Sequence, residues 1–158
     1  MARPPTSPPP IATIVRHMTS SPATIEADRS LAEAHRVMRR HGIRHLPVTA
    51  AGSLVGILSL RDLHLLETLR GVDPEKVTVD EAMTRSPYSV DPGAPVEEVA
   101  RILADNKWGS AVVVDGGKVV GMFTTTDALK LLGRLLKNER LRAARVRRLR
   151  RKRKGLAD

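Results

Sequence analysis

Apolar residues recur at helical spacing in two separate stretches of this 158-residue chain. The apolar positions of the two stretches are Leu31, Ala34, Val37 and Met38, and Val96, Val99, Ala100 and Leu103. This spacing predicts one amphipathic helix in each stretch. Ser30 and Pro95 directly precede them, and both residue types are common where a helix begins.

Two apolar runs follow each predicted helix, with a glycine-containing turn between them. They are LPVTAAGSLVGIL at 46–58 and AVVVDGGKVVGMF at 111–123, and each predicts a β-hairpin. A short extended segment is expected before each helix, ATI in one case and YSV in the other. A second helix is expected after each hairpin, starting with DLHLL and DALKL. The predicted order is therefore strand, helix, strand, strand, helix, twice.

The two halves of this pattern are copies of one another. When the chain is shifted by 65 residues without a gap, Met18 falls on Met83, Thr13 on Thr78 and Asp62 on Asp127. A register held this long indicates an internal duplication. One copy of about 60 residues is marginal as an independent fold, so we expect the two copies to pack on each other.

The composition narrows the class of protein. Hydrophobic residues make up 41% of the chain but only Tyr88, Trp108 and Phe123 are aromatic, which predicts an aliphatic core. The absence of cysteine excludes disulfides, thiolate zinc sites and a cysteine nucleophile. No apolar run approaches the roughly 18 residues that span a bilayer, and the start MARPPTSPPP lacks the apolar region of a secretory signal. We therefore expect a cytoplasmic protein.

The net charge of +10 is concentrated at the C-terminal end. Residues 134–158 hold 12 of the 27 basic residues and 2 of the 17 acidic ones, so the remainder is neutral. Good helix formers without proline predict that the second helix of the second copy continues into this segment. Nucleic acid and an acidic protein are candidate partners of residues 134–154, and a solvated tail is the alternative. An anionic membrane is less favoured because few bulky apolar residues follow Leu136.

Three motifs, two of them present in both copies, resemble a known family. The Met-Thr-x-x-Pro opening, HGIRHLPV before the first hairpin, and Gly-x-x-[Ser/Thr]-x-x-Asp after each hairpin resemble the repeat named for cystathionine β-synthase, the CBS motif. Two such repeats resemble a CBS pair, or Bateman module, over roughly residues 11–133. The second copy departs from the pattern where NKWGSAVVV replaces HGIRHLPVT.

The resemblance implies an α+β fold in which the two repeats pack with pseudo-twofold symmetry. It also implies a regulatory module, often a homodimer, that binds AMP, ADP, ATP or another adenosyl compound in two clefts and needs no obligatory cofactor. The expected divisions are a disordered Pro-rich arm at 1–10, repeats at 11–73 and 74–133, and a basic helix or tail at 134–158.

The resemblance also implies ligand-binding residues, carried over position by position. One cleft would use Thr13, Ile43, Arg44, Thr124, Thr126 and Asp127. The other would use Thr78, Trp108, Gly109, Ser59, Arg61 and Asp62.

The chemistry of these residue types agrees with that assignment. An aspartate where a strand meets a helix can accept both hydroxyls of a ribose, and the helix N-terminus favours a phosphate. Main-chain groups near Ile43 or Trp108 would read adenine, and Arg44 and Arg61 would bind phosphate oxygens. Two alternatives stay open. Each aspartate is also a favoured N-cap without any ligand, and Trp108 is either a purine platform or a core or interface residue.

Other site classes have weaker support. His41 and His45 are four residues apart but cross the expected helix end, so the sequence predicts no metal site there. Ser59 has no evident His-Asp partner, and we find no P-loop or dinucleotide fingerprint, so no enzymatic activity is expected. The alternative function is a ligand-independent dimeric scaffold whose Arg-rich tail binds nucleic acid or another polyanion.

Overall fold

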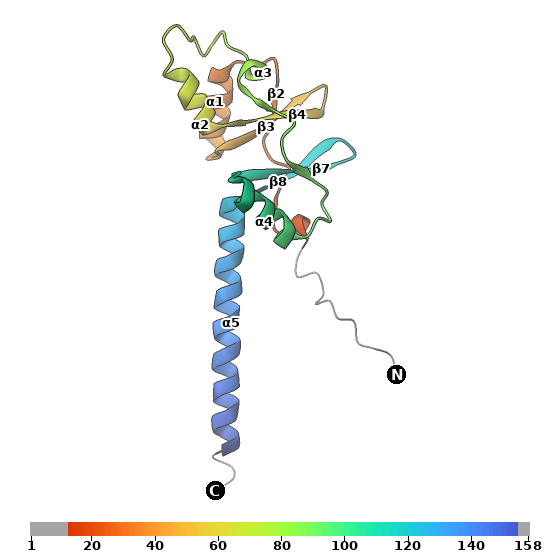
Figure 1. Ribbon diagram of the computed structural model, residues 1–158, viewed down its shortest axis with the longest axis vertical. Coiled ribbons are helices and arrows are strands. Elements are labelled where there is room, and N and C mark those ends of the chain that lie inside the picture. The colour runs from red at the N-terminus through yellow and green to blue at the C-terminus, as the bar shows by residue number, and fades with distance from the viewer. Residues whose placement is uncertain (1–12, 155–158) are drawn as a thin grey trace. The chain divides into compact units, whose positions relative to one another are not determined.

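The computed structural model describes the backbone of residues 13–154 and the side chains up to residue 147 (Figure 1). The proline-rich arm expected at 1–10 lies outside the described residues. The chain forms two compact units, with the boundary between Thr124 and Thr125. The first unit contains both sheets, and the second is one helix.

In each copy the elements follow the predicted order. A short helical turn and a two-residue strand, which the sequence did not predict, precede that order. The first copy contains η1 (Ile14–Arg16), β1 (Thr19–Ser20), β2 (Ile25–Glu26), α1 (Leu31–His41), β3 (His45–Ala50), β4 (Ser53–Ser59) and α2 (Leu60–Glu67). The second contains α3 (Val79–Ala82), β5 (Thr84–Arg85), β6 (Ser89–Val90), α4 (Val96–Asn106), β7 (Ser110–Asp115), β8 (Lys118–Thr124) and α5 (Thr125–Lys154). The predicted α+β fold of two tandem repeats is confirmed.

Two four-stranded mixed sheets form the first unit, and each takes one strand from the other copy. Their strand orders are β2-β3-β4-β5 and β1-β8-β7-β6. β1 therefore pairs with the second hairpin, and β5 pairs with the first. Isolated bridges at Thr13 with Pro95 and at Ser30 with Thr78 repeat the same exchange. β4 also contacts β8, so the copies pack on each other as expected.

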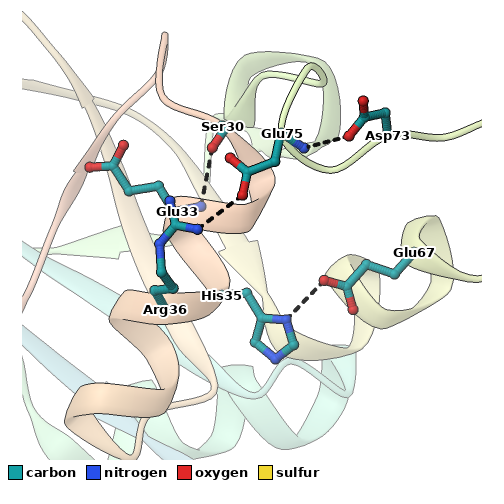
Figure 2. Close-up of polar contacts among 7 residues, drawn as sticks. All are labelled: Ser30, Glu33, His35, Arg36, Glu67, Asp73 and Glu75. Carbon is teal, nitrogen blue, oxygen red and sulfur yellow. Dashed lines mark hydrogen bonds and ion pairs between the residues drawn. The ribbon is translucent and has the colours of Figure 1, made fainter.

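The first long helix of each copy begins where the sequence predicted. Ser30 is the N-cap of α1 and its hydroxyl accepts a hydrogen bond from the Glu33 N–H at 3.2 Å (Figure 2). Pro95 occupies the same position of α4. Each helix ends at a left-handed residue, Gly42 after α1 and Lys107 after α4.

The core of the first repeat is almost entirely aliphatic, as the composition predicted. Its buried residues are Ile25, Leu31, Ala34, Met38, Leu46, Val48, Leu58, Leu63, Val79 and Met83. Val79 and Met83 belong to the second copy and lie in α3 and directly before β5, the strand that pairs with the first hairpin. This part of the second copy therefore completes the core of the first repeat. In the second repeat, Phe123 is fully buried beside an apolar strand, β7.

The repeated glycine of the Gly-x-x-[Ser/Thr]-x-x-Asp motif is explained by the repeated methionine. A Cβ added to Gly56 would overlap the Met83 sulfur, and one added to Gly121 would overlap the Met18 sulfur. Each thioether thus lies where any other residue would place its side chain. The glycine and the methionine of opposite copies form one packing unit, and this unit fixes β1 against β8 and β5 against β4.

Both hairpins turn through two residues with positive φ. These are Ala51 and Gly52 in the first hairpin, and Gly116 and Gly117 in the second. Two central residues with positive φ define a type I′ turn, which matches the twist of antiparallel strands. The hairpin prediction is confirmed in both copies.

The basic segment is helical as far as Lys154, continuous with the second helix of the second copy. The described lysine and arginine side chains of this segment are exposed. The large apolar side chains exposed along the whole of α5 are Leu129, Leu132, Leu135, Leu136, Leu141 and Val146. Among the described residues, no helix combines the length and the apolar character that crossing a membrane requires.

Candidate functional site

The first turn of α2 carries a hydrogen-bonded pair formed by Ser59 and Asp62. Ser59 is the N-cap, and its hydroxyl oxygen accepts from the Asp62 N–H at 3.2 Å. The same hydroxyl donates to Asp62 Oδ2 at 2.5 Å. The helix is therefore capped by Ser59 and not by Asp62, which lies three residues later. A hydroxyl bound to one carboxylate oxygen holds Asp62 in place at a helix end that favours negative charge.

His45 connects this pair to the second repeat. It lies opposite Ser59 in the β3–β4 register. A Cβ added to Gly109 would lie 2.6 Å from His45 Nε2, so the imidazole lies directly against the main chain where β7 begins. A side chain at position 109 would displace the ring, which gives a physical reason for glycine there.

The imidazole of His45 is biased toward its neutral form. Its pKa is lowered from 6.5, first by burial and then by the nearby positive charge of Arg44, while Asp62 acts in the opposite direction. His45 therefore feels both charges, and at neutral pH it offers one N–H donor and one nitrogen acceptor. The imidazole of His45 therefore lies close to Asp62, Arg44 and Gly109.

Trp108 precedes Gly109 and lies at the surface. Its side chain is 45% exposed, so it is not a core residue. Its ring lies 5.5 Å from that of Tyr88, centroid to centroid, with the planes tilted by 34°. Two adjacent aromatic rings of which one is half exposed offer a flat apolar surface next to Gly109.

The other two residues assigned with Asp62 lie at helix starts. Arg61 is exposed in the first turn of α2. Thr78 is the N-cap of α3, and its N–H donates to Glu81 Oε2 at 2.9 Å. Thr78 is thus engaged in capping a short helix and in the bridge to Ser30.

The first three residues of the group assigned with Asp127 have mainly structural contacts. Thr13 caps η1 and bridges to Pro95. The Ile43 N–H donates to the Met38 carbonyl at 3.0 Å, and the Arg44 carbonyl accepts from the Leu60 N–H at 2.8 Å. Arg44 was assigned with this group, yet its charge acts on His45, which lies beside the second group.

The remaining residues of the first group lie on both sides of the unit boundary. Thr124 ends β8, while Thr126 and Asp127 lie in the first turn of α5. Asp127 is half-buried and Thr126 is exposed. Thr124 and Asp127 occupy the sequence positions that Ser59 and Asp62 occupy in the first copy, where a strand leads directly into a helix.

Sequence reasoning missed two members of this neighbourhood. His45 was considered only as a metal ligand, and Tyr88 was assigned only to a short strand. One difference between the copies pointed to this neighbourhood: position 109 is glycine, whereas the matching position of the first copy is Arg44. A missing side chain leaves room for a neighbouring one, which here is His45. Tyr88 gave no such signal, since its partner Trp108 is 20 positions away along the chain.

A family model described as CBS domain matches residues 11–65 and 79–134. The two matched segments correspond to the two copies and together cover more than half of the chain.

Individual proteins give the same result. The chain is 34% identical over 105 residues to inosine-5'-monophosphate dehydrogenase of Korarchaeum cryptofilum, covering 66% of this chain and 21% of that enzyme. It therefore spans about a fifth of that relative's length. Among solved structures, the CBS domain pair of protein MJ0100 in complex with 5-methylthioadenosine and S-adenosyl-L-methionine is 30% identical, with a TM-score of 0.71 over 78% of this chain and 97% of that one. CBSX2 in complex with AMP is 26% identical, with a TM-score of 0.68 over 78% and 97%.

Proposed function

This chain belongs to the CBS domain family, and on that premise we propose that it is a regulatory module that binds an adenosine-containing ligand between its repeats. AMP, ADP, ATP and adenosyl compounds such as S-adenosylmethionine are the candidates. Similar CBS pairs were solved with AMP, with S-adenosyl-L-methionine and with 5-methylthioadenosine. The moiety these three share is adenosine, so adenosine is the part of the ligand we assign to the site.

One observation carries the proposal: residues of both repeats meet around His45. Ser59 and Asp62 come from the first repeat, and Gly109 comes from the second. Asp62 keeps a second carboxylate oxygen beside the one that Ser59 binds, and that oxygen suits a ribose hydroxyl. A ligand that bridges Asp62 and the strand start at Gly109 would hold the two repeats at one relative angle.

The remaining parts of the ligand would follow from the surrounding residues. Arg61 at the start of α2 supplies positive charge for phosphate oxygens. The charge of Arg44, which the resemblance assigns to the other site, also acts on His45. Trp108, paired with Tyr88, supplies a face on which a purine can stack. The N–H groups of Ile43 and Trp108 already cap their helices, at 3.0 Å and 2.9 Å, so main-chain reading of adenine would fall to carbonyl oxygens.

The chain contains a second set of residues that would form the related site. We assign to it, by family resemblance, Thr13, Ile43, Arg44, Thr124, Thr126 and Asp127. Thr78 is likewise retained with Asp62 by resemblance alone, since its contacts are those of a helix cap. This second set is supported mainly by the sequence match between Asp127 and Asp62.

We assign no chemistry to the module itself. The matched region makes up only 21% of the enzyme to which the chain is similar, which is consistent with a regulatory part of a larger protein. A homodimer is a further part of this proposal. Leu65 and Leu69 are 64% and 50% exposed at the end of α2, and they supply apolar surface that a second copy would cover. Light scattering of the purified chain distinguishes a dimer from a monomer.

The second candidate function is polyanion binding by α5. The basic side chains that are described on this 30-residue helix, up to Arg147, are all exposed, a pattern that suits phosphate neutralisation more than base reading. The full chain should then bind duplex RNA or DNA with an affinity that falls steeply with salt. Deletion of residues 137–158 should abolish this binding, and binding that survives the deletion would refute the candidate.

Thermal unfolding with AMP, ADP, ATP, S-adenosylmethionine and NAD in turn tests the main proposal. A ligand that binds only the folded chain must raise the midpoint. We expect a rise for at least one adenosine compound and a smaller rise for Asp62→Ala. Asp28→Ala, which alters an exposed aspartate of the same repeat, is the control. The absence of any rise would favour the scaffold function, and an undiminished rise in Asp62→Ala would refute the assigned site.

A further inference from the structure

Three potential metal ligands converge on the outer helices of the first repeat. They are His35 of α1 and His64 and Glu67 of α2, and one ligand atom of each lies within 4.8 Å of the others. His64 and Glu67 are three residues apart on one helix and therefore share a face. His35 reaches them from the neighbouring helix. These residues lie 29 and 32 positions from His35 in the chain, so only the fold brings them together.

The cluster is already partly ordered. His35 Nδ1 lies 2.8 Å from Glu67 Oε1, an interaction that Figure 2 shows crossing from α1 to α2. The His35 and His64 rings lie 5.4 Å apart at 67°. The side chains of His35 and Glu67 are 27% and 25% exposed, and His64 is exposed. The group therefore lies at the surface, where an ion can enter, but two of its members are held in place.

The donor set suits a borderline divalent ion. Two imidazoles and one carboxylate are a common three-ligand set for Zn²⁺, with a fourth position left to water. Bonds of about 2.0–2.1 Å in tetrahedral geometry bring the ligand atoms to about 3.4 Å from one another. His64 is exposed, so its side chain can rotate toward an ion. His35 Nδ1 and Glu67 Oε1, now 2.8 Å apart, would exchange their hydrogen bond for bonds to that ion.

The second repeat has no equivalent of this cluster. Its residues at the matching positions are Ala100, Leu129 and Leu132. Glycine is kept in both copies where a Cβ would meet a methionine, at Gly56 and Gly121. Three metal-binding side chains that gather in one copy alone, on the outside of two helices, are therefore not required by the fold.

We propose that His35, His64 and Glu67 form a binding site for Zn²⁺ or a similar divalent transition-metal ion. The ion would join α1 to α2. Because Asp62 lies in the first turn of α2, an ion bound near the other end of α2 would also hold the helix that presents Asp62. The site is distinct from the residues assigned to the adenosine ligand, and the proposal does not depend on that ligand.

Calorimetric titration of the untagged, full-length chain with ZnCl₂, after treatment with a chelator, tests this proposal. We expect one ion per chain, and an affinity lowered at least about tenfold in His64→Gln and in Glu67→Gln. His41→Gln, which changes an exposed histidine of α1 outside the cluster, is the matched control and should bind as the original chain does. His64 is exposed, so its replacement should leave the fold intact, which circular dichroism verifies.

A second readout separates this cluster from adventitious binding by histidine. Co²⁺ bound by two imidazoles and a carboxylate in four-coordinate geometry gives a visible absorption band, which His64→Gln should lose and His41→Gln should retain. Failure of the chain to bind Zn²⁺, or equal affinity in His64→Gln and the original chain, would overturn the proposal. In that case, His35 and Glu67 serve only as a hydrogen bond between two helices.

Discussion

The two repeats share their packing residues but differ in their polar ones. Each has a glycine under a methionine sulfur and a hydroxyl residue and an aspartate where the last strand meets a helix. At positions 43–45 the first repeat has Ile, Arg and His, whereas at 108–110 the second has Trp, Gly and Ser. The first repeat alone also carries His35, His64 and Glu67.

The difference separates what the fold requires from what a particular site requires. His45 of one repeat occupies the space that Gly109 of the other leaves, so these two differences are complementary. A symmetric pair, with a large side chain at both 44 and 109, would displace the imidazole. The duplicated scaffold has therefore diverged into two unequal halves, and the adenosine site we propose around His45 uses that inequality.

The largest expected effect comes from filling the space of the shared glycines. Gly56→Ala should cost about 2–3 kcal/mol, because the new Cβ meets both the Met83 side chain and the Thr84 carbonyl, which belongs to the backbone. Gly121→Ala should cost less, about 1 kcal/mol, because only the flexible Met18 side chain has to move. Denaturant unfolding measures both.

Gly93→Ala is the control for this pair, since nothing lies within 4 Å of a Cβ at that position. Its effect should stay within about 0.5 kcal/mol. If Gly121→Ala proved as costly as Gly56→Ala, then the two packing units would be equally rigid, and the distinction between backbone and side-chain contacts would be wrong.

A smaller effect is expected at the helix ends, where the repeats differ. Lys107 has φ of 57° at the position that Gly42 occupies with φ of 61°. A non-glycine residue is disfavoured there, so Lys107→Gly should stabilise the chain by about 0.5–1 kcal/mol. Gly42→Ala should destabilise it by about 1 kcal/mol. A loss of stability in Lys107→Gly would indicate that the lysine side chain contributes more than its backbone conformation costs.

The smallest effect is a pH dependence that only the first repeat should contribute. Burial lowers the pKa of His45 in the folded chain below 6.5, so the unfolded chain binds more protons in the window below that value. The His45 contribution to stability is therefore complete above pH 6.5 and decreases as the pH falls toward the folded-state pKa.

Unfolding at a series of pH values measures this contribution. His45→Gln should show a shallower loss of stability below pH 6.5 than the original chain, and His41→Gln should show the original slope. Equal slopes in His45→Gln and the original chain would mean that the imidazole is protonated as easily in the folded state as in the unfolded one.

Much of the fold could be predicted from periodicity and turn residues. The helix over Leu31–His41 follows from apolar spacing, and both hairpins follow from their glycine turns. The exchange of β1 and β5 between the sheets could not be predicted, because each strand has two residues and its partner lies in the other copy. Such pairings depend on long-range packing, which local patterns do not contain.

The candidate site was predictable only in part. The aspartates at the strand-to-helix junctions were expected, and Asp62 lies there, but its place as cap is taken by Ser59. Serine and aspartate are both favoured N-cap residues, so the sequence alone could not decide whether Ser59 or Asp62 caps the helix. The metal-ligand cluster joins residues about 30 positions apart, and nothing local marks them as neighbours. The ligand contacts of Thr78 and Asp127 remain predictions.

Calorimetric titration of the full chain with AMP and then ATP, repeated with Asp62→Asn, tests the central claim most directly. Asparagine keeps the size of the side chain but removes the charge and one acceptor that a ribose hydroxyl would use. The account predicts that the original chain binds at least one of these nucleotides and that Asp62→Asn lowers that affinity about tenfold or more, while Asp28→Asn leaves it unchanged. Equal affinity in Asp62→Asn and the original chain would contradict it.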